Sequence, residues 1–79
     1  MGRTERVRES EVKAATRLRS VILAHADEHE HDAEQADAAA ESYRGVDVEA
    51  AVSLHRDAAR SRARARELRS ILTEAESDA

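Results

Sequence analysis

The stretch AESYRGVDVEAA, residues 40–51, decides the fold because it is the one place where the chain interrupts its helical pattern. Glycine readily adopts the left-handed conformation that ends a helix, which suits Gly45. Asp47 can accept a hydrogen bond from the backbone at the start of the next helix. Together with Tyr43, these residues predict a turn over 44–47.

Helix-compatible sequence without proline flanks the turn, from about residue 5 to 43 upstream and from about residue 48 to 76 downstream. Apolar and small residues recur at helical spacing in each segment, as one helix face requires. They are Ala15, Leu18, Ile22, Ala26, His29, Ala33, Ala36, Ala40 and Tyr43 upstream, and Ala51, Leu54, Ala58, Ser61, Ala65, Leu68, Leu72 and Ala75 downstream. When the chain folds at the turn, facing residues have numbers that add up to about 90, so alanine meets alanine and large side chains meet large ones. The sequence therefore predicts an all-α fold, in which a single domain (1–79) forms a two-helix antiparallel hairpin with a coiled-coil-like, alanine-rich interface.

Composition describes a small acidic protein of 79 residues with a formal net charge of −4. The absence of cysteine excludes a disulfide framework and a thiolate metal site. No apolar run is long enough to span a membrane, and the N-terminal residues lack the apolar stretch of a signal peptide. We therefore expect a cytoplasmic protein without membrane contacts, with export independent of a signal peptide left open.

Charge supports the same antiparallel arrangement. Residues 26–43 contain seven carboxylates and no lysine or arginine. The predicted register sets them against arginines of the second helix, namely Glu34 against Arg56, Glu30 against Arg60, and Asp27 and Glu28 against Arg62 and Arg64. Exposed pairs of this kind contribute only a few tenths of a kcal/mol each, but a row of them disfavours parallel pairing.

The apolar surface of residues 7–23 is wider than one partner helix can cover. A small chain with so few large apolar residues usually gains stability by association. We therefore expect the end opposite the turn to join another copy, as a homodimer or four-helix bundle, or to bind the helices of another protein. The expected interface residues are Val7, Val12, Leu18, Val21, Ile22, Leu23, Leu68, Ile71 and Leu72. The alternative is a frayed N-terminal arm with scattered exposed valines.

The stretch HADEHEHD, residues 25–32, is the part of the sequence most suggestive of a metal site. His25 and His29 are four residues apart on one helix face, a spacing that can chelate zinc or nickel. No third remote ligand accompanies them, and His29 is also expected in the helix–helix interface, facing Ser61 or Arg62. We therefore predict no metal and no cofactor, with the two histidines as the candidate ligands if one binds.

The stretch RDAARSRARARELR, residues 56–69, raises nucleic-acid binding as an alternative function, because clustered arginines can track phosphates. Its contacts would be Arg60, Arg62, Arg64, Arg66 and Arg69. The negative net charge, the lack of interleaved aromatic residues and the acidic first helix favour charge pairing within the chain instead.

Catalytic signatures are missing from the sequence, which has no cysteine nucleophile, no glycine-rich phosphate loop and no Gly-x-Ser-x-Gly motif. A two-helix hairpin also offers no concave pocket for a small-molecule substrate. We therefore predict a non-enzymatic interaction protein, acting as an adaptor or an assembly module.

The turn sequence YRGVDVEAA, residues 43–51, resembles the W-x-G turn of the small helical-hairpin substrates of type VII secretion. Tyr43 stands in the place of the tryptophan and Gly45 in that of the glycine. The resemblance covers about thirty residues, and no tyrosine after the second helix supplies the family's export signal. It implies a homodimer or heterodimer without enzymatic activity that is exported or acts as an adaptor, and a type VII secreted hairpin is therefore a further alternative.

Overall fold

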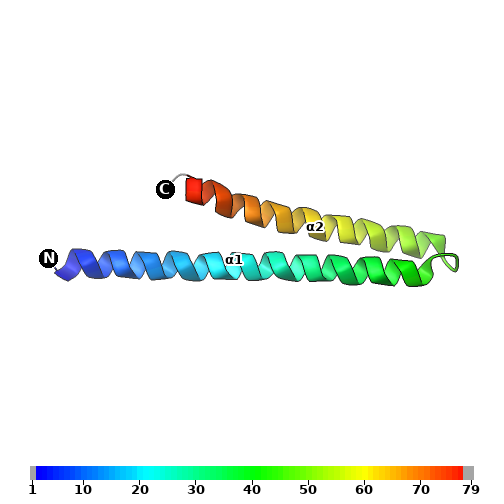
Figure 1. Ribbon diagram of the computed structural model, residues 1–79, viewed down its shortest axis with the longest axis horizontal. Coiled ribbons are helices and arrows are strands. Elements are labelled where there is room, and N and C mark those ends of the chain that lie inside the picture. The colour runs from blue at the N-terminus through cyan, green and yellow to red at the C-terminus, as the bar shows by residue number, and fades with distance from the viewer. Residues whose placement is uncertain (1, 78–79) are drawn as a thin grey trace.

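The computed structural model describes residues 2–77, with side chains from residue 5 onward, and consists of two helices joined by one turn (Figure 1). Helix α1 spans Gly2–Tyr43 and helix α2 spans Val48–Ser77. The helices run antiparallel and side by side, so both termini lie at the end opposite the turn. The molecule is a rod of 69 × 18 × 11 Å. The predicted all-α helical hairpin is confirmed.

The turn satisfies the backbone groups that the two helix ends leave without helical partners. The carbonyl of Tyr43 accepts hydrogen bonds from the backbone N–H groups of Val46 (3.0 Å) and Asp47 (2.9 Å). Gly45, which directly precedes Val46, has a φ of +83°, a left-handed conformation that residues with a Cβ disfavour. Asp47 then caps α2, because its Oδ1 accepts a hydrogen bond from Ala50 N–H at 3.1 Å. The backbone hydrogen bonds, the glycine conformation and the helix cap of residues 44–47 thus reverse the direction of the chain.

We expect Gly45→Ala to lower the free energy of unfolding by about 1–2 kcal/mol, since a Cβ is strained at positive φ. A Cβ built at Gly45 meets no other atom within 4 Å, so the loss comes from backbone strain alone. The measurement is thermal unfolding followed by circular dichroism. Gly45→Asn is the matched control and should lose less, because asparagine tolerates the left-handed region. Equal losses for the two variants would contradict this account.

The interior of the hairpin is made of alanine. Five residues are buried to 1% exposure or less, namely Ala26, Ala33, Ala40, Ala58 and Ala65, and they recur every seven residues along each helix. No larger side chain among the described residues is fully buried. Because alanine methyl groups fill the fully buried layers, the two backbones approach closely in the half of the hairpin next to the turn.

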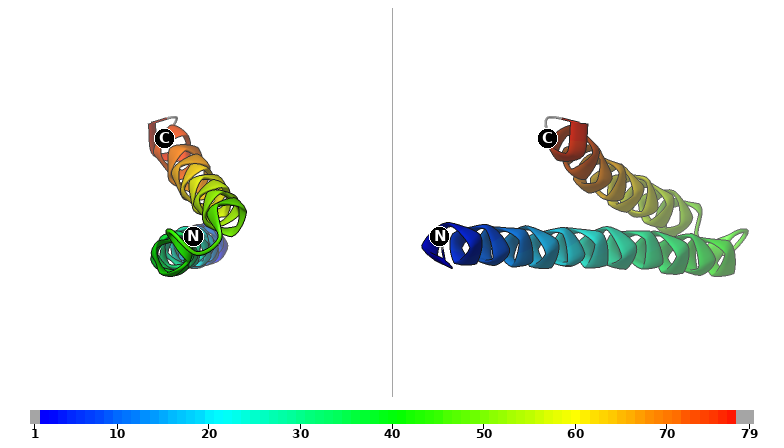
Figure 2. Two further views of the ribbon diagram at one scale, coloured as in Figure 1. Left: turned by 90° about the vertical axis from the view of Figure 1, so that its right-hand side faces the viewer. Right: turned by 60° about the vertical axis from the view of Figure 1, so that its left-hand side comes forward.

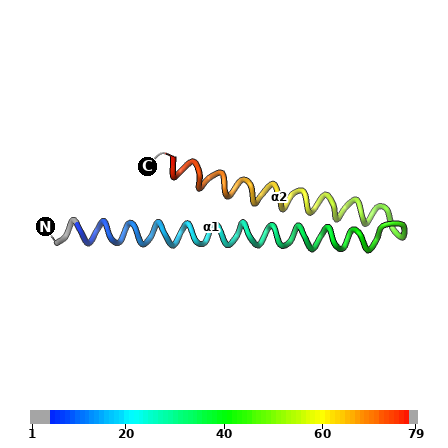
Figure 3. Tube along the Cα trace, viewed as in Figure 1, coloured from blue at the N-terminus to red at the C-terminus, as the bar shows by residue number. Residues whose placement is uncertain are grey.

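The helices diverge toward the termini, as the trace in Figure 3 and the second view in Figure 2 show. Larger side chains replace alanine in that half, where Ile22 of α1 and Leu68 and Leu72 of α2 lie partly buried between the helices. Because the size of the contact residues sets the distance between helix axes, these side chains hold the ends apart. Helix α1 also continues past the end of α2 (Figure 1). The hairpin is therefore closed at the turn and widens at its other end.

Candidate functional site

One flank of the hairpin, which we call the first flank, carries ion pairs between the helices. Its residues are Glu30 and Asp37 of α1 and His55, Arg62 and Arg69 of α2, each spaced by seven along its helix. Arg62 and the His55 ring both donate hydrogen bonds to the Asp37 carboxylate, the latter at 2.9 Å. Arg69 donates to Glu30 and, at 3.0 Å, to Asp27. The first flank therefore links α1 to α2 through opposite charges.

These ion pairs differ from those that the sequence predicts. Glu30 pairs with Arg69 and not with Arg60, and Arg62 pairs with Asp37 and not with Asp27 or Glu28, which are shifts of about two and a half helical turns. Helical side chains lean toward the N-terminus of their own helix, and in an antiparallel pair the two leans point toward each other. A long arginine therefore meets a carboxylate nearer the turn than the residue level with it. The predicted pairs of Glu34 with Arg56 and Glu30 with Arg60 are wrong for this reason.

Two further predicted pairings are also wrong. Asp27 contacts Arg69 and not Arg62 or Arg64, since Arg62 turns to Asp37 and Arg64 pairs with Glu67 of its own helix at 3.1 Å. A cross-helix pair near the termini joins Arg19 Nε of α1 to Glu76 Oε1 of α2 at 2.7 Å, so there the basic residue lies on α1 and the acidic residue on α2. The antiparallel charge pattern survives although individual partners change.

The ion pairs change the acidity of the groups that they join. Hydrogen bonds from Arg62 and then His55 lower the pKa of Asp37 from its ordinary value of 3.8. The hydrogen bond that Arg69 donates to Glu30 lowers the pKa of the Glu30 carboxyl from 4.5 and raises the pKa of the Arg69 guanidinium. All of these groups are solvent-exposed enough for water and salt to screen the pairs. Their role is to fix the register and not to supply most of the stability.

We expect the first flank to make stability depend on pH at the acid end. A carboxylate with a lowered folded-state pKa stabilises the fold above its unfolded pKa, and that contribution is lost as the pH falls through the folded value. For Asp37 the loss therefore begins near pH 3.8 and continues below it. Melting midpoints of wild type and Asp37→Asn should differ at about pH 5, and the difference should shrink as the pH falls below 3.8. A difference that persists undiminished in acid would contradict the assignment.

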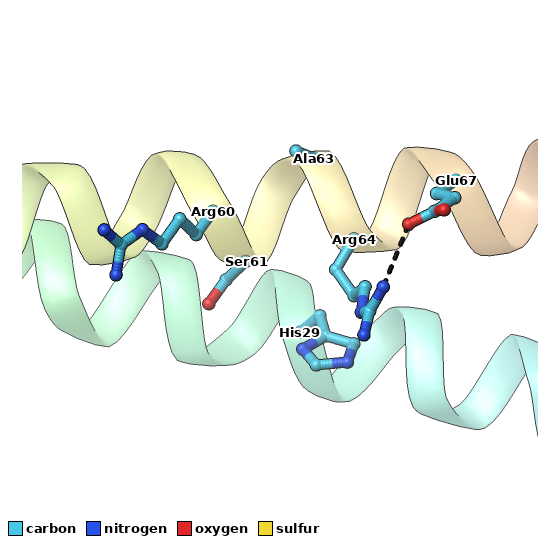
Figure 4. A pocket seen from close by; sticks show the side chains of 6 residues that line it. All are labelled: His29, Arg60, Ser61, Ala63, Arg64 and Glu67. Atoms are coloured by element: carbon cyan, nitrogen blue, oxygen red, sulfur yellow. Dashed lines mark hydrogen bonds and ion pairs between the residues drawn. The ribbon is translucent and has the colours of Figure 1, made fainter.

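The opposite flank, which we call the second flank, contains the residues that sequence analysis singled out for chemistry. His29 lies partly buried between the helices in a shallow hollow that also includes Ser61, Arg60 and Arg64 (Figure 4). The prediction that His29 faces α2 near Ser61 agrees with this hollow, whereas Arg62 points to the first flank. The hollow is open to solvent and does not enclose any of the side chains that line it.

The structure separates the two candidate metal ligands. The ring of His25 is exposed and lies 3.6 Å from the carboxylate of Glu28, whereas His29 is turned into the helix–helix interface. Among the residues that the structure describes, no three histidine, cysteine or acidic side chains come together in a metal-binding group. The arrangement therefore supplies no first coordination sphere for a metal ion.

The arginines of residues 56–69 are divided between the two flanks. Arg62 and Arg69 are bound to carboxylates of α1, and Arg60 and Arg64 contact only acidic residues of α2 within the described part of the chain. Arg66 is exposed. The predicted neutralisation of this segment by α1 thus applies to the first flank alone, and the second flank keeps an exposed basic surface beside acidic residues of α1.

The end opposite the turn, which we call the open end, exposes large apolar side chains. Leu18 is 61% exposed and Ile71 is 49% exposed, and Val7, Val12 and Val21 are each more than half exposed. Ile22, Leu23, Leu68 and Leu72 are partly buried. Between the diverging helices, Leu18, Ile22, Ile71 and Leu72 line an apolar groove of about 330 Å³. The residues predicted for an interface thus remain largely uncovered by their own chain.

His55 and Asp37 were missed as a pair by sequence reasoning. The seven-residue spacing of Glu30 and Asp37, and of His55, Arg62 and Arg69, was the available signal, because equal spacing places all of them on one flank. Predicting the pair also requires the direction of the side chains, which point toward the N-terminus of their own helix, in addition to the register.

These features define a small antiparallel helical hairpin with an alanine interior, a charged first flank and an apolar open end. Compared with models of known families, with curated proteins and with solved structures, the chain gives no match. In residues 2–77 neither helix has a segment with the length and apolar character needed to cross a bilayer.

Proposed function

We propose that the protein is a non-enzymatic protein–protein interaction module that self-associates through its open end. The observation that carries the proposal is the exposure of Leu18, Val21 and Ile71 around the apolar groove. Contiguous exposed apolar surface of this kind is typical of interaction sites in soluble proteins. An interior of five alanine methyl groups also buries little apolar area, so covering the open end would add much of the stability of the fold.

The absence of catalysis is part of the proposal and rests on the character of the described surface. The hollow around His29 is shallow, and no buried side chain in the described part of the chain is polar or charged. Catalytic acids and bases usually require an enclosed pocket that perturbs their pKa values.

Multi-angle light scattering of the purified chain at low micromolar concentration tests the proposal. We expect the mass of two or more chains of 8.7 kDa each and a fully helical circular dichroism spectrum. A stable, fully helical monomer at the same concentration would overturn self-association, because the open end would then need no cover.

Nucleic-acid binding is the second candidate, favoured by the exposed Arg60 and Arg64 on the second flank. Phosphate binding by these side chains would weaken steeply as salt increases, because bound counterions are released. A gel shift at low salt that disappears in the double variant Arg60→Gln/Arg64→Gln would support it. The neighbouring carboxylates of α1, which repel phosphate, place this candidate behind self-association.

A further inference from the structure

The second flank has a chemical pattern that differs between its two helices. Counting by sevens along each helix, His25 and Asp32 follow Leu18 on α1, and Arg64 lies between Asp57 and Ile71 on α2. These two rows border the helix–helix interface on the side opposite the ion pairs of the first flank. Figure 4 shows the side chain of Arg64 next to His29, and that of Arg60 beyond Ser61 on the same side of the hairpin.

Charge and apolar character are distributed along the second flank in two zones. In the middle of the rod, α1 presents the carboxylates of Glu28 and Asp32 while α2 presents the guanidinium groups of Arg60 and Arg64. Arg60 and Arg64 are 81% and 64% exposed, and their ion pairs are with acidic residues of their own helix. Toward the open end, the flank becomes apolar, with Leu18 and Val21 on α1 and Ile71 on α2.

We propose that the occupant of the second flank is a second copy of the chain, related by a two-fold axis parallel to the long axis of the hairpin. This arrangement rests on the self-association proposed above and specifies its geometry. Both turns lie at the same end of the dimer, and α1 of each copy packs against α2 of the other. Every helix then has antiparallel neighbours, as in a four-helix bundle.

Symmetry fixes the register of this dimer. A two-fold axis along the rod allows no axial shift, so each residue of α1 is level with the same region of α2 in the second copy as in its own chain. Glu28 and Asp32 therefore face Arg60 and Arg64 of the second copy. Leu18 and Val21 face Ile71 of the second copy, which closes the apolar zone. The acidic side chains of α1 thus meet arginines and its apolar side chains meet Ile71, twice per dimer, while Asp57, which is also level with Asp32, is paired with Arg60 of its own helix.

The opposed arrangement, with the two turns pointing away from each other, matches less well. Centring such a dimer on the same apolar residues brings Ile71 against its counterpart, with α1 along α1 of the second copy and only the C-terminal part of α2 along α2 of the second copy. It then sets Glu67 near Glu74 of the second copy, and Glu28 near Glu11 of the second copy. Like charges at these positions disfavour the opposed arrangement, and it places Arg60 and Arg64 outside the part of α2 that α2 of the second copy overlaps.

Energy transfer between labels at the turn distinguishes the two arrangements. Val46 is 82% exposed at the turn, so Val46→Cys accepts a fluorophore without disturbing the helices. With parallel hairpins the two labels lie within about 20 Å, the width of a small bundle. With opposed hairpins they lie about 80 Å apart, at 1.5 Å per helical residue. A matched Ser70→Cys variant puts the label on an exposed site near the open end, where the copies are close in either arrangement.

We expect energy transfer in mixtures of donor- and acceptor-labelled chains for both variants. Transfer at Ser70→Cys without transfer at Val46→Cys would overturn the parallel dimer and leave self-association intact. Transfer at neither site would show that the chain does not self-associate, and the proposed function would fail with it.

Charge exchange supplies a second, independent test. Glu28→Arg/Asp32→Arg makes the second flank basic, and Arg60→Glu/Arg64→Glu makes it acidic, so neither variant should dimerise by itself. An equimolar mixture should restore the dimer, because α1 of each variant then faces opposite charge on α2 of the other. A mixture that stays monomeric while wild type dimerises would contradict the proposed facing of these residues.

Discussion

The Ala33→Leu substitution is expected to lower the free energy of unfolding by about 1–3 kcal/mol, and the melting midpoint by roughly 10 °C. Ala33 is completely buried between the helices, with other alanines seven residues away on either side. Those neighbouring layers hold the backbones close together, so three added carbon atoms have no space unless the helices separate locally. Separation would expose the neighbouring methyl groups and break the geometry of the first-flank ion pairs. Thermal and urea unfolding measure the loss.

The Ala38→Leu substitution is the matched control for this prediction. It lies in the same helix five residues later, and its side chain faces solvent. Leucine and alanine have similar helix propensities, so this variant should unfold within about 0.5 kcal/mol of wild type. If Ala33→Leu were instead more stable than wild type, the helices would tolerate a wider spacing, and close alanine packing would not be what holds the hairpin.

The fold could be predicted because each of its determinants acts locally or repeats. Gly45 and Asp47 determine the turn through their own backbone conformation and capping, which need no knowledge of the rest of the chain. The alanine interior follows from seven-residue spacing on two helices of opposite direction. Because both helices obey the same period, a single register aligns all their layers, and the positions predicted to pair as alanines include all five that the structure buries.

The ion pairs could not be predicted residue by residue, since level position alone does not decide them. Asp37 draws both His55 and Arg62, and the reach and lean of the side chains determine that choice. The divergence of the two helices toward the open end could likewise not be predicted from the seven-residue spacing. It results from the change from alanine to Ile22, Leu68 and Leu72, whose sizes set the spacing of the helices there.

The double variant Leu18→Ser/Ile71→Ser is expected to raise the dissociation constant of the proposed self-association by roughly a thousandfold. The two substitutions remove four apolar side chains from a symmetric dimer interface. Each removal should cost about 1 kcal/mol of association free energy, because every one of these side chains is already partly covered within its own chain. Analytical ultracentrifugation measures the change. Val48→Ser/Val52→Ser is the matched control: it removes two valines of 69% and 44% exposure near the turn. Because these valines lie outside the open end and the second flank, the control should associate like wild type. Equal weakening by both pairs would mean that association follows overall apolar surface and not the open end.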